Sequence, residues 1–309
     1  MKKIFENSWI VCLIAIFCNI LWGSAFPSVK MGYIYFAIHA EDTAAQILFA
    51  GCRFFFAGLF VILFCSVVQK KVALPKKADL FGITVTGCVQ TVLQYCFFYI
   101  GLAHTSGAKS SILTATNVFF GILIACLLVK SEVLTYQKII GCLIGFFGVV
   151  LINLSNKEVT PSWTNIGDIA ILLSSISNAM ADVLIKKFSQ KTNPALLNGY
   201  QFLFGGTVMI IGASIFGGRF PSICLPGIAV LAYLSFLSAC AYTLWSILLK
   251  YNPVTKVTIY GFTNPIFGVL LSVYILKENT AFGIRCVLSL IFVCAGIIIV
   301  NSTRVMKRK

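Results

Sequence analysis

Ten long apolar runs restrict the fold of this chain more than any other feature. Each holds about 20 mostly apolar residues, the length that an α-helix needs to cross a bilayer. The runs lie at 9–30, 44–68, 80–103, 107–129, 135–154, 165–187, 196–217, 226–249, 254–277 and 281–301. They are too long for the strands of a transmembrane barrel. We therefore expect an all-α integral membrane protein with ten transmembrane helices and no soluble catalytic or receptor domain.

Composition agrees, with 59% hydrophobic residues, only 11% charged residues and a mean hydropathy of +0.95. If the runs cross the membrane alternately, 17 of the 24 Lys and Arg residues lie on the side of the N-terminus, six on the other side and Arg53 within a run. Positive residues favour the cytoplasmic side, so we expect a multi-pass protein of the cell (plasma or inner) membrane with both termini cytoplasmic. The first run also resembles a signal peptide cleaved after Ala25, but nine further runs favour a first helix.

The net charge of +15 does not indicate a nucleic-acid partner, because the basic residues lie at the ends of runs rather than along a stripe with aromatic residues. Most of the 12 cysteines lie inside runs, with Cys224 as the main exception. No Cys-x-x-Cys or Cys/His spacing is present, and neither His39 nor His104 has a candidate partner. We expect no disulfide framework, metal site or cofactor. The expected partners are a small-molecule substrate and the lipid bilayer; the oligomeric state stays open, and a monomer suffices.

The chain contains an internal repeat. Residues 50–58 align with 198–206 at an offset of 148. Residues 116–123 align with 263–270 at an offset of 147, and five of these eight aligned positions are identical. Three pairs at the same spacing extend the match: Tyr95 with Tyr242, Lys109 with Lys256, and Gly148 with Gly296. We expect a first five-helix repeat at 9–154, a second at 165–301 and a basic cytoplasmic tail at 302–309.

Five spans per repeat is an odd number, so the second repeat enters the membrane from the opposite side. Inverted repeats are typical of secondary transporters, in which a site between the repeats faces each side of the membrane in turn. The repeat thus points to transport more strongly than hydrophobicity does.

Several motifs resemble the EamA-type transporters of the drug/metabolite transporter superfamily. The first repeat of that family is resembled by residues 22–26 with Lys30 and by residues 53–58. An acidic residue at the end of the fourth span is typical of the family, and Glu132 stands there in this chain. The second repeat supplies Asn264-Pro265 and Lys277-Glu278 at the equivalent places. The chain departs from the family at the following positions: Ser131 and Lys277 before the closing Glu, Val118 for a usual Pro, and Asn178 for a usual Trp.

The resemblance implies a ten-helix transporter, often an exporter of amino acids or related metabolites, driven by gradients without ATP. No Walker phosphate loop is present, in agreement with this. Alternatives are an importer or exchanger of another class (a nucleotide-like solute, a cofactor or a drug-like cation) and, from another class, a membrane-embedded enzyme or scramblase. A membrane-embedded enzyme needs several catalytic groups that converge inside the membrane. The runs contain one Asp well inside a span and no midspan His, so we expect no enzyme activity.

Polar residues inside a span must face neighbouring helices or a cavity, because unpaired polar groups in lipid are unfavourable. We select these substrate-cavity candidates: Asn19, Trp22, Ser24, Gln94, Tyr95, Asn117, Asn178, Tyr242, Trp245, Tyr260 and Asn264. Further midspan polar residues are Gln90, Thr114, Ser174, Tyr233, Ser238 and Thr263. Interhelical hydrogen bonds or interfacial anchoring are the alternatives for these side chains. The resemblance also points to the first, third, fourth, sixth, eighth and ninth spans as the cavity walls.

Two charged residues inside spans are separate candidates. An ionised carboxylate at a helix centre costs about 2.5–3.5 kcal/mol on insertion scales. Asp182 is accordingly a candidate for proton or cation coupling, with an ion pair to Lys186 one turn later as the alternative. Arg53 is a candidate for binding a substrate carboxylate, or for a structural role on backbone carbonyls. Pro27 and Pro265 can act either as hinges or as packing kinks.

Overall fold

The computed structural model describes residues 2–39, 41–104, 110, 113–129, 132–153, 166–276 and 284–302. Lys109, Lys157, Lys277, Glu278, Ser131 and the tail 303–309 lie outside the described residues. All regular structure in the described ranges is helical, which confirms an all-helical membrane fold.

A helix overlaps each of the ten expected runs. The elements are α1 (Lys2–Glu6), α2 (Ser8–Phe36), α3 (Thr43–Gln69), η1 (Lys77–Asp79), α4 (Leu80–Thr86), η2 (Gly87–Leu93), α5 (Gln94–His104), α7 (Asn117–Leu128), α8 (Tyr136–Asn153), α9 (Ile166–Phe188), α10 (Pro194–Ile215), α11 (Leu225–Tyr251), α12 (Val254–Thr258), η3 (Ile259–Phe262), α13 (Thr263–Leu276) and α14 (Ile284–Ser302). In the described part of the chain, six helices are long and apolar enough to cross a membrane.

Local chemistry sets several helix ends. Asp42 caps α3 by accepting a hydrogen bond from the N–H of Ala45 at 2.9 Å. The helix α2 continues past Lys30 to Phe36, further than expected, because Phe36 packs on Phe49 and Phe220 at the end of the bundle. It then ends at Ala37, which adopts a left-handed conformation.

The two prolines behave differently. Pro27 lies within the continuous helix α2, whereas Pro265 lies in the first turn of α13, immediately after the 3-10 turn η3. A proline in the first turn of a helix removes an N–H that has no intrahelical partner, so Pro265 marks a helix start. The third span contains a different irregularity, the π-helical segment η2, between α4 and α5.

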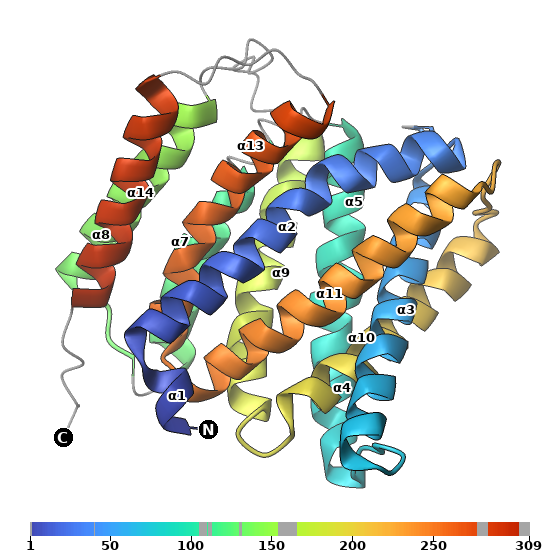
Figure 1. Cartoon of the computed structure of the whole chain (residues 1–309), viewed down its shortest axis with the longest axis horizontal. Coiled ribbons are helices and arrows are strands. Elements are labelled where there is room, and N and C mark those ends of the chain that lie inside the picture. The colour runs from blue at the N-terminus through green and yellow to red at the C-terminus, as the bar shows by residue number, and fades with distance from the viewer. Residues whose placement is uncertain are drawn as a thin grey trace.

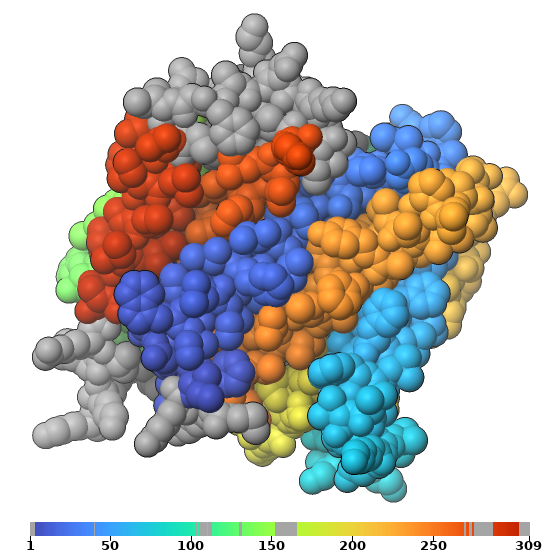
Figure 2. Space-filling model, in the orientation of Figure 1, coloured from blue at the N-terminus to red at the C-terminus, as the bar shows by residue number. Residues whose placement is uncertain are grey.

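Two helix pairs form the opposite edges of the bundle (Figure 1): α8 with α14, and α3 with α10. Between them, α2 and α11 run side by side across one face (Figure 2). Side chains on the outside of the bundle are largely apolar; Phe64 and Leu127, for example, are 69% and 82% exposed. An exposed surface of this kind suits lipid rather than water.

The contacts between helices are reciprocal across the two halves of the chain. α2 packs on α11 and α13, while α9, which occupies the same position in the second half, packs on α5 and α7. The pairs α3–α10 and α8–α14 each join one helix of the first half to its counterpart in the second.

Glycines permit the close approach of α3 and α10. A Cβ atom added at Gly206 would lie 2.4 Å from the backbone nitrogen of Phe55 and 2.8 Å from the carbonyl oxygen of Gly51. Small residues at such contacts are the usual means of packing helices in membranes. By contrast, Gly212 on the same helix has nothing within 4 Å of an added Cβ.

We predict that Gly206→Ala lowers the stability of the purified protein, because its methyl group meets backbone atoms that cannot move independently. Overpacking of this kind costs about 1–3 kcal/mol. Gly212→Ala is the matched control and should raise stability slightly, since alanine is the better helix former. Thermal unfolding in one detergent compares the two variants. Equal melting temperatures for both variants would contradict the close packing of α3 on α10.

Candidate functional site

A small cavity lies inside the bundle, between α2 and α11 on one side and α5, α7 and α9 on the other. Its volume is about 90 Å³. Eleven of the thirteen predicted site residues line it: Asn19, Trp22, Arg53, Gln94, Tyr95, Asn117, Asn178, Asp182, Tyr242, Trp245 and Asn264. Residues far apart in the sequence, and from both halves of the chain, therefore meet at one place.

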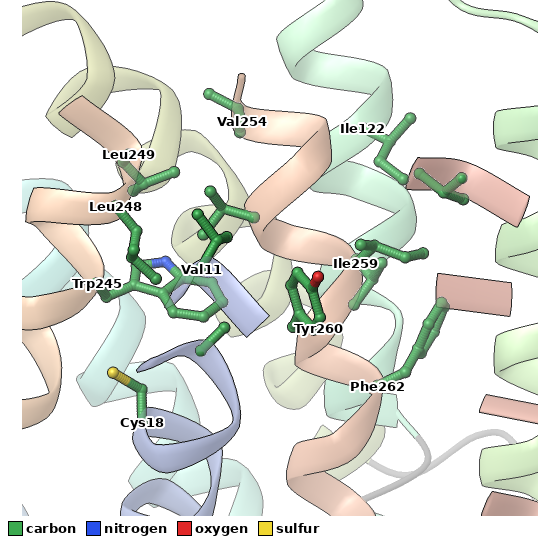
Figure 3. Close-up of a cluster of buried hydrophobic side chains, with 14 of the residues drawn as sticks. Val11, Cys18, Ile122, Trp245, Leu248, Leu249, Val254, Ile259, Tyr260 and Phe262 are labelled. Atoms are coloured by element: carbon green, nitrogen blue, oxygen red, sulfur yellow. The ribbon is translucent and has the colours of Figure 1, made fainter. Parts of the chain in front are cut away.

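The structure does not bring Ser24 and Tyr260 into the lining. The hydroxyl of Ser24 bonds the hydroxyl of Tyr233 on α11 at 2.6 Å, which is the interhelical bond named as the alternative. Tyr260 lies in a cluster of buried apolar side chains with Val11 and Ile259 (Figure 3). Trp245 reaches the same cluster with its ring while also lining the cavity.

Eight further lining residues, most of them apolar, were not predicted, because midspan polarity identifies only polar side chains. They are Ala25, Phe26, Val29, Phe98, Leu102, Ala179, Thr258 and Gly261. Helical spacing identifies most of them: 22, 26 and 29 share one face of α2, as 94, 98 and 102 do on α5. Thr258 and Gly261 lie at the junction of α12 and η3, where no such periodicity applies.

One face of α11 organises the polar part of the cavity. Ser238, Tyr242 and Trp245 are spaced by four and three residues, so their side chains lie along one face. Each contacts a different group from another helix. The Nε of Arg53 donates to the Ser238 hydroxyl at 2.8 Å, the hydroxyl of Tyr242 bonds that of Tyr95, and the indole N–H of Trp245 donates to Asp182 at 3.0 Å.

Arg53 is buried among aromatic and hydroxyl groups, with only 2% of its surface exposed. Its Nη1 also donates to the hydroxyl of Tyr99 at 3.4 Å, and its guanidinium carbon lies 5.1 Å from the ring centre of Phe54. These partners are neutral. In the described part of the chain, no carboxylate forms an ion pair with Arg53. A buried cation with only neutral partners is costly in stability, which favours a functional role.

Gln201, which aligns with Arg53 in the second half, has neutral partners in a different setting. Its amide bonds the side chains of Gln90 and Asn198, and Asn198 donates to the backbone oxygen of Tyr242 at 2.9 Å. This network lies outside the cavity lining. The positive charge is therefore a specialisation of one half of the chain.

Asp182 is 6% exposed, and its carboxylate accepts from the indole of Trp245. The ion pair with Lys186 that was the alternative does not form. The ammonium of Lys186 instead donates to the backbone oxygens of Lys250 and Asn252, at 3.2 and 2.8 Å. These carbonyls lie at the C-terminal end of α11, where a positive charge is favourable.

Several cavity groups lack a hydrogen-bond partner among the described residues: Asn19 Oδ1, Trp22 Nε1, Gln94 Oε1, Thr114 Oγ1 and Asn264 Oδ1. Buried polar atoms in membranes are normally paired. Unpaired acceptors and donors that face a shared cavity are what a binding site for a polar solute requires.

A second set of contacts joins the helices beside the N-terminal end of α12. The carboxylate of Glu132 accepts from the backbone N–H groups of Val254 and Thr255, at 2.6 and 3.1 Å. An acidic side chain at the start of a helix is favourable, because the free N–H groups are directed toward it. Glu132, which the sequence marked only as a motif residue, thus connects the end of the fourth span to the start of the ninth.

We predict that Arg53→Gln leaves the melting temperature of the ligand-free protein unchanged or raises it, because the substitution removes a buried charge that has no charged partner. A structural role for Arg53 predicts the opposite result, a loss of about 1–3 kcal/mol, because the hydroxyl groups of Ser238 and Tyr99 lose a hydrogen-bond donor. Ser238→Ala is the control, since it keeps the charge and removes one of its partners, and it should lower stability. Thermal unfolding in detergent separates the two roles.

Comparison with known proteins gives the family. The family model described as "EamA-like transporter family" matches residues 9–154 and again 165–302. The uncharacterized transporter YetK of Bacillus subtilis (strain 168) is 30% identical over 80% of this chain and 77% of its own length. An uncharacterized transporter of Archaeoglobus fulgidus is 29% identical over 85% of this chain and 88% of its own length.

A solved crystal structure is also similar, with a TM-score of 0.72, covering 94% of this chain and 95% of its own. At 14% sequence identity, this likeness concerns the fold alone. The two matches of the family model cover nearly the whole described bundle, and so the chain belongs to the EamA-like transporter family and is a membrane transporter.

Proposed function

We propose that the protein is a gradient-driven secondary transporter of small organic metabolites, and that it exports amino acids or related compounds across the cell membrane. The substrate binds in the cavity between two inverted five-helix repeats, which expose it to each side in turn. One observation carries this proposal: a single cavity, lined by unpaired polar atoms, is built by equivalent helices of both halves of the chain.

The reciprocal contacts support the inverted repeat. If each helix is replaced by its counterpart in the other half, the contact of α2 with α11 becomes that of α9 with α5, and the contact of α2 with α13 becomes that of α9 with α7. A twofold relation between the halves produces this exchange. With five spans in each half, the axis lies in the membrane plane, as in transporters that alternate between two open sides.

The cavity volume supports a small solute. Pockets for drug-sized ligands are typically about 300–1,000 Å³, whereas this cavity measures about 90 Å³. Because the cavity is small, a small metabolite is a better candidate than a bulky drug-like cation. The lining combines aromatic rings with amides and two charges, which suits a molecule with both polar and apolar parts.

Orientation is part of the same proposal. α1 and the C-terminal end of α14 lie at the same end of the bundle (Figure 1), as an even number of spans requires. The excess of Lys and Arg on that side favours a cytoplasmic location for both termini. We also propose that the protein is not an enzyme, as its named relatives are transporters.

We predict that purified protein in liposomes catalyses counterflow of at least one solute from a panel of amino acids and related metabolites, well above empty liposomes. Thermal stabilisation in detergent selects the panel members to test. Trp22→Ala should reduce the counterflow, because it removes an aromatic wall of the cavity. The exposed Phe64→Ala, on the lipid side of α3, is the control and should leave flux unchanged. Absence of counterflow for every stabilising solute would contradict the proposal.

The same vesicles address coupling at Asp182. If this carboxylate couples transport to protons, an imposed pH gradient accumulates substrate in wild-type vesicles but not in vesicles containing Asp182→Asn. Counterflow of a neutral amino acid without a gradient should survive in that variant, whereas a solute whose own cationic group binds Asp182 should lose counterflow. An identical response to the gradient in both proteins would exclude Asp182 as the coupling group.

Cysteine labelling tests the orientation. Cys224 precedes α11 at the end of the bundle opposite α1, and its thiol is partly exposed. In a variant that keeps only this cysteine, a membrane-impermeant thiol reagent should label intact cells from outside. A cysteine at the exposed position Lys71 is the matched control and should react only after the cells are opened. The reverse pattern would invert the proposed topology.

A further inference from the structure

The cavity contains two buried opposite charges that do not pair with each other. Arg53 is 2% exposed and Asp182 is 6% exposed, and both line the same cavity. The partners of Arg53 are hydroxyl groups, and the partner of Asp182 is an indole N–H. Neither has an oppositely charged partner among the residues that the structure describes. Buried charges are usually retained only when something compensates them.

The two charges contact α11 at different levels of that helix. Arg53 is bonded at Ser238 and Asp182 at Trp245, seven residues later on one continuous helix. At 1.5 Å per residue, these positions lie about 10 Å apart along the helix axis. The cavity therefore has a positive pole and a negative pole at different depths.

Aromatic rings connect the two poles. The guanidinium carbon of Arg53 lies 5.8 Å from the ring centre of Tyr95, whose hydroxyl bonds that of Tyr242. The ring of Trp22 lies 5.0 Å from that of Tyr242 and 5.0 Å from that of Trp245, in edge contacts with both. A wall of this kind accommodates methylene groups and tolerates a passing cation.

We propose that the cavity selects an amino acid with a cationic group at the far end of an unbranched side chain, of which lysine is the simplest probe. The carboxylate binds Arg53, the methylene chain lies along Trp22 and Tyr242, and the distal ammonium binds Asp182. The unpaired Gln94 Oε1, next to Tyr95 in sequence, is available to the α-ammonium group. This inference rests on the proposed function and specifies its substrate class.

Molecular dimensions favour this substrate over a neutral α-amino acid. In any α-amino acid one carbon atom holds the carboxylate and the α-ammonium, so these two groups cannot reach both poles. In extended lysine six bonds separate the carboxyl carbon from Nζ, about 7 Å. Charge-assisted hydrogen bonds of about 2.8 Å at each end extend this reach beyond 10 Å. An extended lysine is thus long enough to span the two levels of α11 that Arg53 and Asp182 contact.

The test uses ligands that each lack one element of lysine. Norleucine lacks the distal ammonium, cadaverine lacks the carboxylate, and Nε-acetyl-lysine keeps the distal nitrogen but loses its charge and adds an acetyl group. Binding to purified full-length protein is measured by calorimetry in detergent. We expect lysine to bind at least tenfold more tightly than each of the three analogues, since each analogue loses one charge-assisted contact.

Substitutions of Asp182 and Arg53 show which residue binds which end of lysine. Asp182→Asn should weaken lysine at least tenfold and leave norleucine unchanged, and Asp182→Glu should restore most of the preference. Arg53→Gln should weaken lysine and norleucine but leave cadaverine unchanged. Melting temperatures of all variants show whether they are folded. Equal binding of lysine and norleucine by the wild type, or equal losses for both in Asp182→Asn, would overturn the inference.

Measurements of binding and of counterflow together distinguish a failure of this inference from a failure of the proposed transport function. Counterflow of other metabolites without lysine binding would refute the two-pole substrate and leave the transporter intact. Lysine binding without counterflow of any solute would instead refute the proposed transport.

Discussion

The need to pair polar groups away from lipid is the constraint on which this structure depends. An unpaired polar group in hydrocarbon is costly, so a chain of this composition must turn its polar side chains inward. The bundle does this chiefly along one face of α11, where Ser238, Tyr242 and Trp245 each contact a polar group from another helix. The outer surfaces are left to residues such as Phe64 and Leu127. The same arrangement that makes the bundle compatible with lipid also creates its polar interior.

The polar groups at the edges of the bundle and those at its centre have different partners. At the edge formed by α3 and α10, glycines bring backbones into contact, and nearby amides such as Gln201 have side-chain partners. At the centre, Arg53 has no charged partner, and Asn19 and Gln94 keep unpaired oxygens. We interpret the centre of the bundle as the site of binding. In this view substrate supplies the missing partners.

Much of the fold follows from the sequence alone. Hydrophobic length located helices at all ten runs, and the repeat suggested two equivalent halves, because both signals are carried by many residues at once. Local features of the helices were harder to predict. The π-helical segment before Gln94 and the short turn η3 before Pro265 depend on packing, and the extension of α2 to Phe36 depends on a contact with Phe220, far away in the sequence.

The candidate site shows a similar division. Polar residues in the middle of spans were predicted to line a cavity, and Asn19, Asn117, Asp182 and Asn264 do so. The same criterion selected Ser24, whose hydroxyl is hydrogen-bonded to another helix instead. Polarity alone does not distinguish an interhelical hydrogen bond from a position in the cavity wall. Whether Asp182 would pair with Lys186 or Trp245 depended on which helix packed against α9. That contact lies 63 residues away in the chain and leaves no local pattern.

The central claim is that one cavity between the two halves opens to each side of the membrane in turn. Its most direct test is the accessibility of a single cysteine at Ala25, which lines the cavity on α2. In a background without other cysteines, the account predicts that a small impermeant thiol reagent labels this position from either side of the membrane, and that bound substrate slows labelling from both. Labelling from one side only, with or without substrate, would contradict alternating access.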